Sequence, residues 1–222
     1  LGGRFGLVSR ESLLLTNNVL LVVACATVLL GTLYPLLIDA LGVGKISVGP
    51  PYFDAVFVPV MTPILFLMAA GPFARWKEAS VAEIARALRW AIAAGVVVAI
   101  ALPLIYGRWS ALTAMGLFFA AWVVVASLLN FVERVQHTRA GRSFLSAVLK
   151  QPRSFVGMHT AHIGIAVFVV GVTMVNSFQE ENDIKMAPGD TTTVAGYSFK
   201  FNGVKAVEGP NYVAAQGDFD LA

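Results

Sequence analysis

Charged residues are scarce in this chain, and cysteine and histidine are scarcer still. Only 13% of the 222 residues are Asp, Glu, Lys or Arg, and 57% are hydrophobic, whereas a soluble domain carries roughly 25% charged residues. Together with a mean hydropathy of +0.74, this composition predicts a polytopic membrane protein. The formal net charge of +3 does not indicate nucleic-acid binding, because the basic residues are dispersed between apolar segments.

The single cysteine, Cys25, excludes an internal disulfide, a Cys-x-x-Cys motif and a thiolate metal site. Because it lies in an apolar run, we expect it to be buried and inert. The sequence also lacks a Ser-His-Asp order, a phosphate-binding loop and zinc-ligand spacing. It begins with Leu1 and shows no cleavable signal peptide, so we interpret the chain as an internal piece of a longer protein.

Apolar runs divide most of the chain. A membrane-spanning helix needs about 20 apolar residues, and we place five spans at about residues 18–38, 55–74, 90–106, 110–131 and 155–178. Pro59, Pro63 and Pro72 should bend or loosen the second span. The fold class predicted for residues 1–178 is therefore an all-α polytopic membrane bundle.

Basic residues indicate the orientation of the bundle. If the N-terminal end is cytoplasmic, eleven basic residues lie inside and five outside, which satisfies the positive-inside rule. The inner residues are Arg4, Arg10, Arg75, Lys77, Arg86, Arg89, Arg134, Arg139, Arg142, Lys150 and Arg153. The outer residues are Lys45, Arg108, Lys185, Lys200 and Lys205. The stretch 76–89 is amphipathic, with Val81, Ile84, Ala85 and Leu88 on one stripe, and we expect it to lie along the inner membrane face.

Residues 179–222 predict a small β-rich domain outside the membrane. Aromatic residues alternate with polar ones over residues 197–201, as in a strand with one apolar face. We predict turns at residues 187–190 and 208–211 and a hairpin turn at Asn202-Gly203. A segment of about 44 residues is small for an independent core, so it should continue beyond Ala222 or pack on another surface.

Two of the three histidines, His159 and His162, lie inside the last span, which holds no Lys, Arg, Asp or Glu from Phe155 to Phe178. Ionisable groups at membrane depth are costly and usually functional. His162 lies roughly 10 Å below the inner edge, because a helix rises 1.5 Å per residue. It is a candidate axial ligand of haem iron; the alternative is a neutral histidine hydrogen-bonded to another helix. Gly157 and Gly164 flank it and could let a backbone or flat macrocycle approach.

The other histidines are weaker candidates. His159 lies one turn before His162 on roughly the same face, so the two cannot be opposite ligands of one haem. A metal shared by both lacks a third ligand nearby, and we expect His159 to be a polar cap near the inner interface. We interpret His137 as a solvated residue of a basic loop, and Asp39 and Asp54 as solvated helix ends. No catalytic residue is predicted.

Three stretches match a known pattern in the right order. The first is SRESLLL with two asparagines at residues 9–18, followed by LGTLYP at residues 30–35. The second is GKISVGPPYF at residues 44–53. The third joins Gly157-Met158, Ala161-His162 and Gly164 to ENDIKM, PGD and GPNY at residues 181–186, 188–190 and 209–212. On these residues the chain resembles the C-terminal part of the CcmF family of cytochrome c-type biogenesis proteins.

The resemblance implies a subunit of a haem lyase in the bacterial inner membrane. Such proteins accept haem from a membrane-tethered chaperone, CcmE, and help attach it to the Cys-x-x-Cys-His motif of apocytochrome c, with other maturation subunits such as CcmH. It also implies a haem b held by two membrane histidines, one of which, in the Ala-His-x-Gly context, corresponds to His162. The second ligand, the tryptophan-rich segment and the outer-face histidines of the family do not occur in this chain.

Two further functions remain open at this stage. The chain could belong to a transporter or channel, with the proline-broken second span lining a path, although no inverted repeat or paired intramembrane acid is found. Alternatively, the bundle could only anchor the outer β domain for protein contacts, which predicts no bound chromophore.

Overall fold

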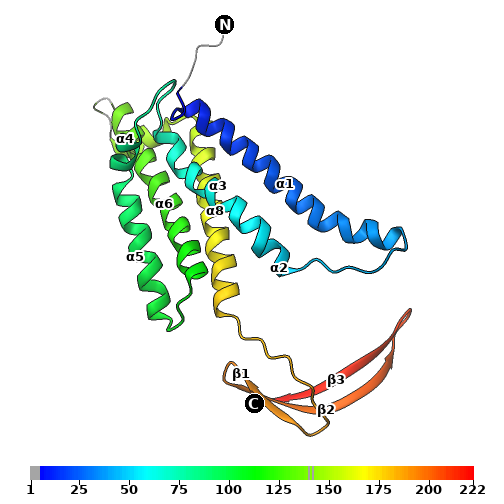
Figure 1. The fold of residues 1–222 in the computed structure, drawn as a ribbon. Helices are drawn as coiled ribbons and strands as arrows, with labels where there is room; N and C mark the ends of the chain where they lie inside the picture. Colours follow the sequence, from blue (N-terminus) through cyan, green and yellow to red (C-terminus); the bar gives the residue numbers. More distant parts are fainter. Residues whose placement is uncertain (1–5, 140, 142) are drawn as a thin grey trace. The chain divides into compact units, whose positions relative to one another are not determined.

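The computed structural model describes residues 6–139, 141 and 143–222. The chain divides after Ser177 into a helical unit and a strand unit, each described by itself below (Figure 1). Two of the residues counted for the orientation, Arg4 and Arg142, lie outside the described residues.

The first helix, α1, spans Arg10–Ala40. Ser9 caps it, because its hydroxyl oxygen accepts a hydrogen bond from the backbone N–H of Ser12 at 3.2 Å. The helix ends where Gly42 takes a left-handed conformation, with φ of 66°. Cys25 lies on its exposed surface, so the expectation of a buried cysteine is wrong: most of α1 has no helix packed over it within the described residues.

A short ladder holds the start of α1 against the segment that follows the second span. The backbone N–H of Gly6 donates to the carbonyl of Lys77 at 2.7 Å, that of Ala79 to Val8 at 2.8 Å, and that of Arg10 to Arg75 at 2.9 Å. The Glu11 carboxylate accepts the Lys77 N–H at 2.9 Å. These bonds fasten α1 to the loop before α4.

The second span is broken, as its prolines predict. It comprises α2 (Pro50–Tyr52), the π-helical turn η1 (Phe53–Phe57), α3 (Val58–Ala70) and the 3₁₀ turn η2 (Gly71–Phe73). The π turn ends two residues before Pro59, which cannot donate a backbone hydrogen bond. The Tyr52 hydroxyl donates to the carbonyl of Thr27 on α1 at 3.0 Å. Gly31 allows this approach: a Cβ there would lie 2.6 Å from Tyr52 Cε1.

The segment 76–89 is less regular than the amphipathic pattern predicts. Helix α4 covers only Val81–Ala87 and meets α5 (Arg89–Ile105) at a bend of 61°. Of the predicted apolar stripe, Leu88 is buried and Ile84 packs against the core, whereas Val81 and Ala85 are exposed. Helix α5 then runs beside α6 (Ala111–Thr138), where Gly95 lies against the ring of Phe118.

Helix α6 forms an antiparallel pair with α8 (Arg153–Phe178), and α7 (Phe144–Leu149) connects them. Near one end the hydroxyls of Thr113 and Ser177 are hydrogen-bonded at 2.6 Å. Near the other end Phe131 stacks on Phe155, with ring centroids 5.6 Å apart. The buried core lies between them and the neighbouring helices α3 and α5, and it includes Leu65, Leu88, Trp122, Val123 and Ala166.

The strand unit is an antiparallel sheet in the order β1-β2-β3, formed by Thr191–Val194, Tyr197–Glu208 and Val213–Leu221. The turns predicted at residues 187–190 and 208–211 are present. The hairpin turn predicted at Asn202-Gly203 is wrong, because β2 continues through these residues with a register shift opposite β3. The tight hairpin turn is instead Ala195-Gly196, with φ of 52° and 85°.

Four helical stretches among the described residues are long and apolar enough to cross a membrane, and a fifth is added if α4 and α5 count as one broken span. Together with the small antiparallel sheet, they confirm the predicted fold class: a helical membrane bundle followed by a β-rich region.

Candidate functional site

The candidate site lies on α8, where two imidazoles lie in a stretch, Ser154 to Phe178, that holds no Lys, Arg, Asp or Glu. Pro152 precedes the helix, and its carbonyl accepts hydrogen bonds from the N–H groups of Phe155 and Val156, which completes the first turn. No Lys, Arg, Asp or Glu follows until Glu180. His159 and His162 therefore lie within a span that offers no counter-charge of its own.

His159 is the more deeply buried of the two histidines, with 5% of its surface exposed. The rings of Phe155 and Phe131 meet it edge-on, with centroids at 4.5 Å and 5.5 Å. Among the described residues, neither of its ring nitrogens has a hydrogen-bond partner. The sequence predicts a polar cap near the inner interface; the structure instead shows an imidazole enclosed by aromatic rings.

His162 is half-buried, and its ring centroid lies 6.4 Å from that of His159 with planes at 74°. Within the part of the chain that the structure describes, its nitrogens make no hydrogen bond to another helix, so the alternative of a hydrogen-bonded packing histidine gains no support there. A neutral imidazole in this state can donate a lone pair to a metal.

A third polar side chain, Ser127 on α6, lies at this level. The antiparallel contacts of Thr113 with Ser177 and of Phe131 with His159 place position 127 at about the height of position 163, the residue that follows His162. Ser127 is buried, and its hydroxyl oxygen has no partner among the described residues. Sequence reasoning missed Ser127 because a lone serine in an apolar helix carries no signal until its partner helix is known.

The glycines of α8 lie away from this cluster. A Cβ placed on Gly157, Gly164 or Gly171 would meet no atom of the described residues within 4 Å. At about 100° per residue, Gly157 and Gly164 lie roughly 140° and 160° around the helix from His162, in the same direction. Although they flank His162 in sequence, these glycines form an open stripe on the opposite face of α8. A backbone or a flat macrocycle that approached α8 over the glycines would therefore not lie beside His162.

Other residues considered from the sequence do not join the site. His137 is on the last turn of α6 rather than in a loop, exposed and 3.9 Å from Glu133. Asp39 and Asp54 are exposed, at the end of α1 and in the π turn η1. Within the described residues, no group of three or more His, Cys, Asp or Glu side chains could hold a metal ion together.

The amino-acid sequence is similar to that of known proteins. Residues 177–222 match the family model described as CcmF C-terminal beta-sandwich. The cytochrome c-type biogenesis protein CcmF of Pseudomonas aeruginosa is 40% identical over 220 residues, which cover 98% of this chain and 33% of that protein. The chain belongs to the CcmF family. Escherichia coli CcmF is 38% identical over 205 residues, covering 92% of the chain and 30% of that protein.

The structural comparison agrees with the family assignment. A solved structure of cytochrome c haem lyase CcmF matches with a TM-score of 0.64 and 25% identity, over 98% of this chain and 33% of that one. The chain thus spans about a third of the length of the CcmF relatives it matches. Within that third lie His159, His162 and the strand unit.

Proposed function

We propose that the chain acts in cytochrome c maturation as part of a membrane haem lyase, and that His162 is an axial ligand of a haem b in the bundle. The observation that carries the ligand assignment is the state of His162: a half-buried imidazole, in an uncharged span, with no hydrogen-bond partner among the described residues. The names of the relatives, cytochrome c-type biogenesis protein and haem lyase, support the wider role.

The side chains around His162 fit such a group. Axial ligation needs a neutral imidazole, and an apolar span without counter-charges favours the neutral form. Phe155 and Phe131 enclose the neighbouring His159 and keep water from that side of the helix. A second ligand must come from another segment, because the one histidine outside α8, His137, is exposed on the last turn of α6. Bound haem b would supply one-electron exchange, which we propose keeps incoming haem iron reduced.

The proposed partners follow from the same role. They are a CcmE-like haem chaperone, an apocytochrome c, CcmH-like maturation subunits and the lipid bilayer. We place the protein in the bacterial inner membrane, with the start of α1 cytoplasmic and residues 179–222 periplasmic. The basic residues at the ends of α1, α4, α6 and α8 support this orientation.

The test is the reduced visible spectrum of the protein purified at its natural length, with and without His162→Ala. A bis-histidine b-type spectrum should disappear in His162→Ala and persist in the matched control His137→Ala, which removes an exposed histidine of α6. A spectrum unchanged by His162→Ala would refute the ligand assignment. A colourless wild type from haem-replete cells would favour a transporter or a membrane anchor instead.

A further inference from the structure

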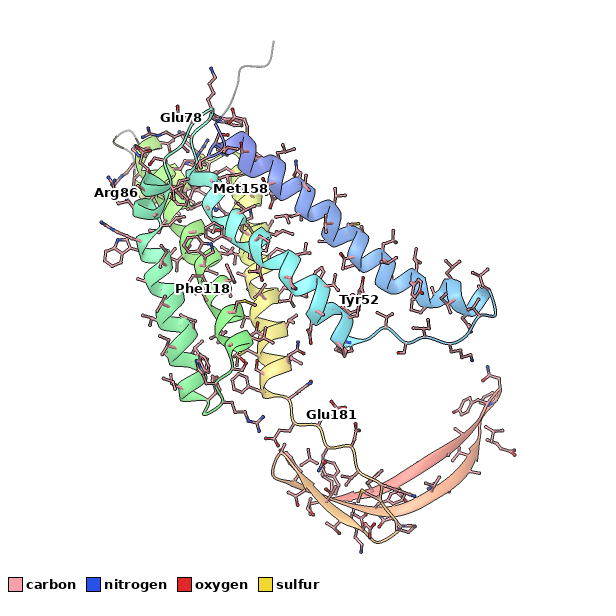
Figure 2. The ribbon with its side chains drawn as sticks, in the orientation of Figure 1. Tyr52, Glu78, Arg86, Phe118, Met158 and Glu181 are labelled. Atoms are coloured by element: carbon pink, nitrogen blue, oxygen red, sulfur yellow. The ribbon has the colours of Figure 1, made fainter. Side chains whose placement is uncertain are left out.

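A basic cavity opens at the end of the helical unit where α1 and α8 begin and α6 ends. Its volume is about 890 Å³, within the range of about 300–1,000 Å³ typical of ligand sites. Arg10, Arg75, Arg86, Arg89 and Arg134 line it. Figure 2 shows Arg86 on α4 and Met158 near the start of α8, two of the residues that border the cavity.

The cavity carries an excess of positive charge. Five guanidinium groups face two carboxylates, those of Glu83 and Glu133. Arg75 is 3.6 Å from Glu83, and both side chains are largely exposed. Glu133 is paired weakly with His137 at 3.9 Å. At least three arginines therefore have no carboxylate partner among the described residues, and such a cluster favours a ligand with phosphate groups.

Several of these arginines are held in place by uncharged neighbours. Arg10 lies over the ring of Trp76 at 5.1 Å, and Arg134 lies over Phe155 at 4.6 Å while its Nε donates to Gln151 at 3.3 Å. Within the described chain, Arg86 has neither an ion pair nor a hydrogen bond. Among the residues that the structure describes, the guanidinium groups of Arg10 and Arg134 are thus oriented without being neutralised, and that of Arg86 is left without a counter-charge.

An apolar cavity adjoins the basic one. Its volume is about 430 Å³, and Val125, Leu128, Leu129 and Val132 of α6 line it. The two cavities share Phe73, Ala87 and Glu133, so a charged compartment continues directly into an apolar one. An amphiphile with a phosphate head and a hydrocarbon tail can fill both the basic and the apolar cavity, whereas a free phosphate can occupy only the basic one.

We propose that the two cavities bind an anionic phospholipid, with its phosphates on the arginines and the start of an acyl chain along α6. The location agrees: Trp76 and Trp90 are exposed at this end of the bundle, as aromatic residues are at membrane interfaces. Basic pockets at the cytoplasmic ends of membrane helices are suited to phospholipid headgroups. The proposal is independent of haem binding.

The test measures lipid binding to the protein at its natural length, purified in detergent and stripped of lipid, by native mass spectrometry. The probes are cardiolipin, phosphatidylcholine and inorganic pyrophosphate. Arg86→Gln combined with Arg89→Gln should weaken cardiolipin binding about tenfold, since each basic residue near a membrane surface contributes to anionic lipid binding. The matched control, Lys150→Gln with Arg153→Gln, removes the same charge at the same end but outside the cavity.

Tighter binding of cardiolipin than of phosphatidylcholine, sensitive to the cavity pair and not to the control pair, supports the proposal. Equal weakening by the two pairs would overturn it, since it would indicate general surface attraction. Pyrophosphate binding as tightly as cardiolipin would also overturn it and would identify a free phosphate compound as the ligand.

Discussion

The imidazole of His159 meets the ring of Phe155 edge-on, with centroids 4.5 Å apart and planes at 79°. The two residues are one turn apart on α8, so the helix itself sets this contact. The ring of Phe131 on α6 also meets the His159 imidazole edge-on, with the ring centroids 5.5 Å apart. The result is a buried polar ring that the described residues leave without a hydrogen bond.

Replacing this imidazole should not harm the fold. A buried polar group without a partner costs about 1–3 kcal/mol, and an apolar group of similar shape avoids that cost. We expect His159→Leu to leave the free energy of unfolding unchanged or to raise it by about 1 kcal/mol, as measured by thermal melting followed by far-ultraviolet circular dichroism. Haem content should be retained, because His162 is untouched.

Phe155→Leu is the matched control for His159→Leu. It keeps a large apolar side chain but loses the stacked and edge-on ring contacts, so stability should fall by about 1 kcal/mol. A clear loss of stability in His159→Leu would mean that its ring nitrogens have partners outside the described residues.

Gly31 should tolerate no side chain. A Cβ there would lie 2.6 Å from Tyr52 Cε1, and the Tyr52 ring is fixed by its hydrogen bond to Thr27. We expect Gly31→Ala to lower the free energy of unfolding by about 1–3 kcal/mol through overpacking. In the same melting experiment Gly44→Ala serves as the control, since a Cβ at Gly44 has open space. Equal melting temperatures for the two variants would contradict the close contact of α1 and α2.

The hairpin turn between β1 and β2 can be improved. Ala195 holds φ of 52° and precedes Gly196 at 85°, the left-handed pair that a two-residue type I′ turn needs. Asparagine adopts this conformation more readily than alanine, so Ala195→Asn should stabilise the strand unit by about 0.5 kcal/mol. Gly196→Ala should destabilise it. Amide hydrogen exchange across β1 and β2 would measure both changes, and slower exchange in Gly196→Ala would refute the turn geometry.

The proposed orientation can be tested with single cysteines in a Cys25→Ser background. A cysteine replacing Gly44, in the loop after α1, should react with a membrane-impermeant maleimide added to the periplasmic side of intact spheroplasts. A cysteine replacing Lys150, between α7 and α8, should react only after the membrane is permeabilised. The reverse pattern would invert the topology that the basic residues indicate.

The sequence was sufficient for the features that depend on composition and local spacing. Uncharged apolar runs predict the helices of the bundle. Of the three prolines expected to bend or loosen the second span, Pro72 lies in the 3₁₀ turn and Pro59 follows the π turn, whereas Pro63 lies inside the α-helix α3. The positions of helix ends were less accessible: α6 continues to Thr138, past the end of its apolar run, because a helix extends into polar residues when its backbone bonds are satisfied.

The contacts that the sequence could not predict are those that need a partner element. Asn202-Gly203 has the preferred composition of a tight turn, yet the antiparallel pairing of Phe201 with Phe219 and the continuing ladder to Glu208 keep it inside β2. The burial of His159 depends on Phe131, and the relevance of Ser127 depends on the register of α6 against α8. Local propensity cannot report any of these.

The ladder between residues 6–10 and 75–79 makes one end of the α1–α3 pair a fixed pivot. At the far end, α1 passes into the loop of residues 41–49, where Leu41, Val43 and Ile46 are exposed, and the Tyr52 hydroxyl is hydrogen-bonded to the carbonyl of Thr27 on α1. If α1 separates from α3, the distance between the two helices should therefore increase most at the proposed periplasmic surface and least at the proposed cytoplasmic surface, where these backbone hydrogen bonds hold them together.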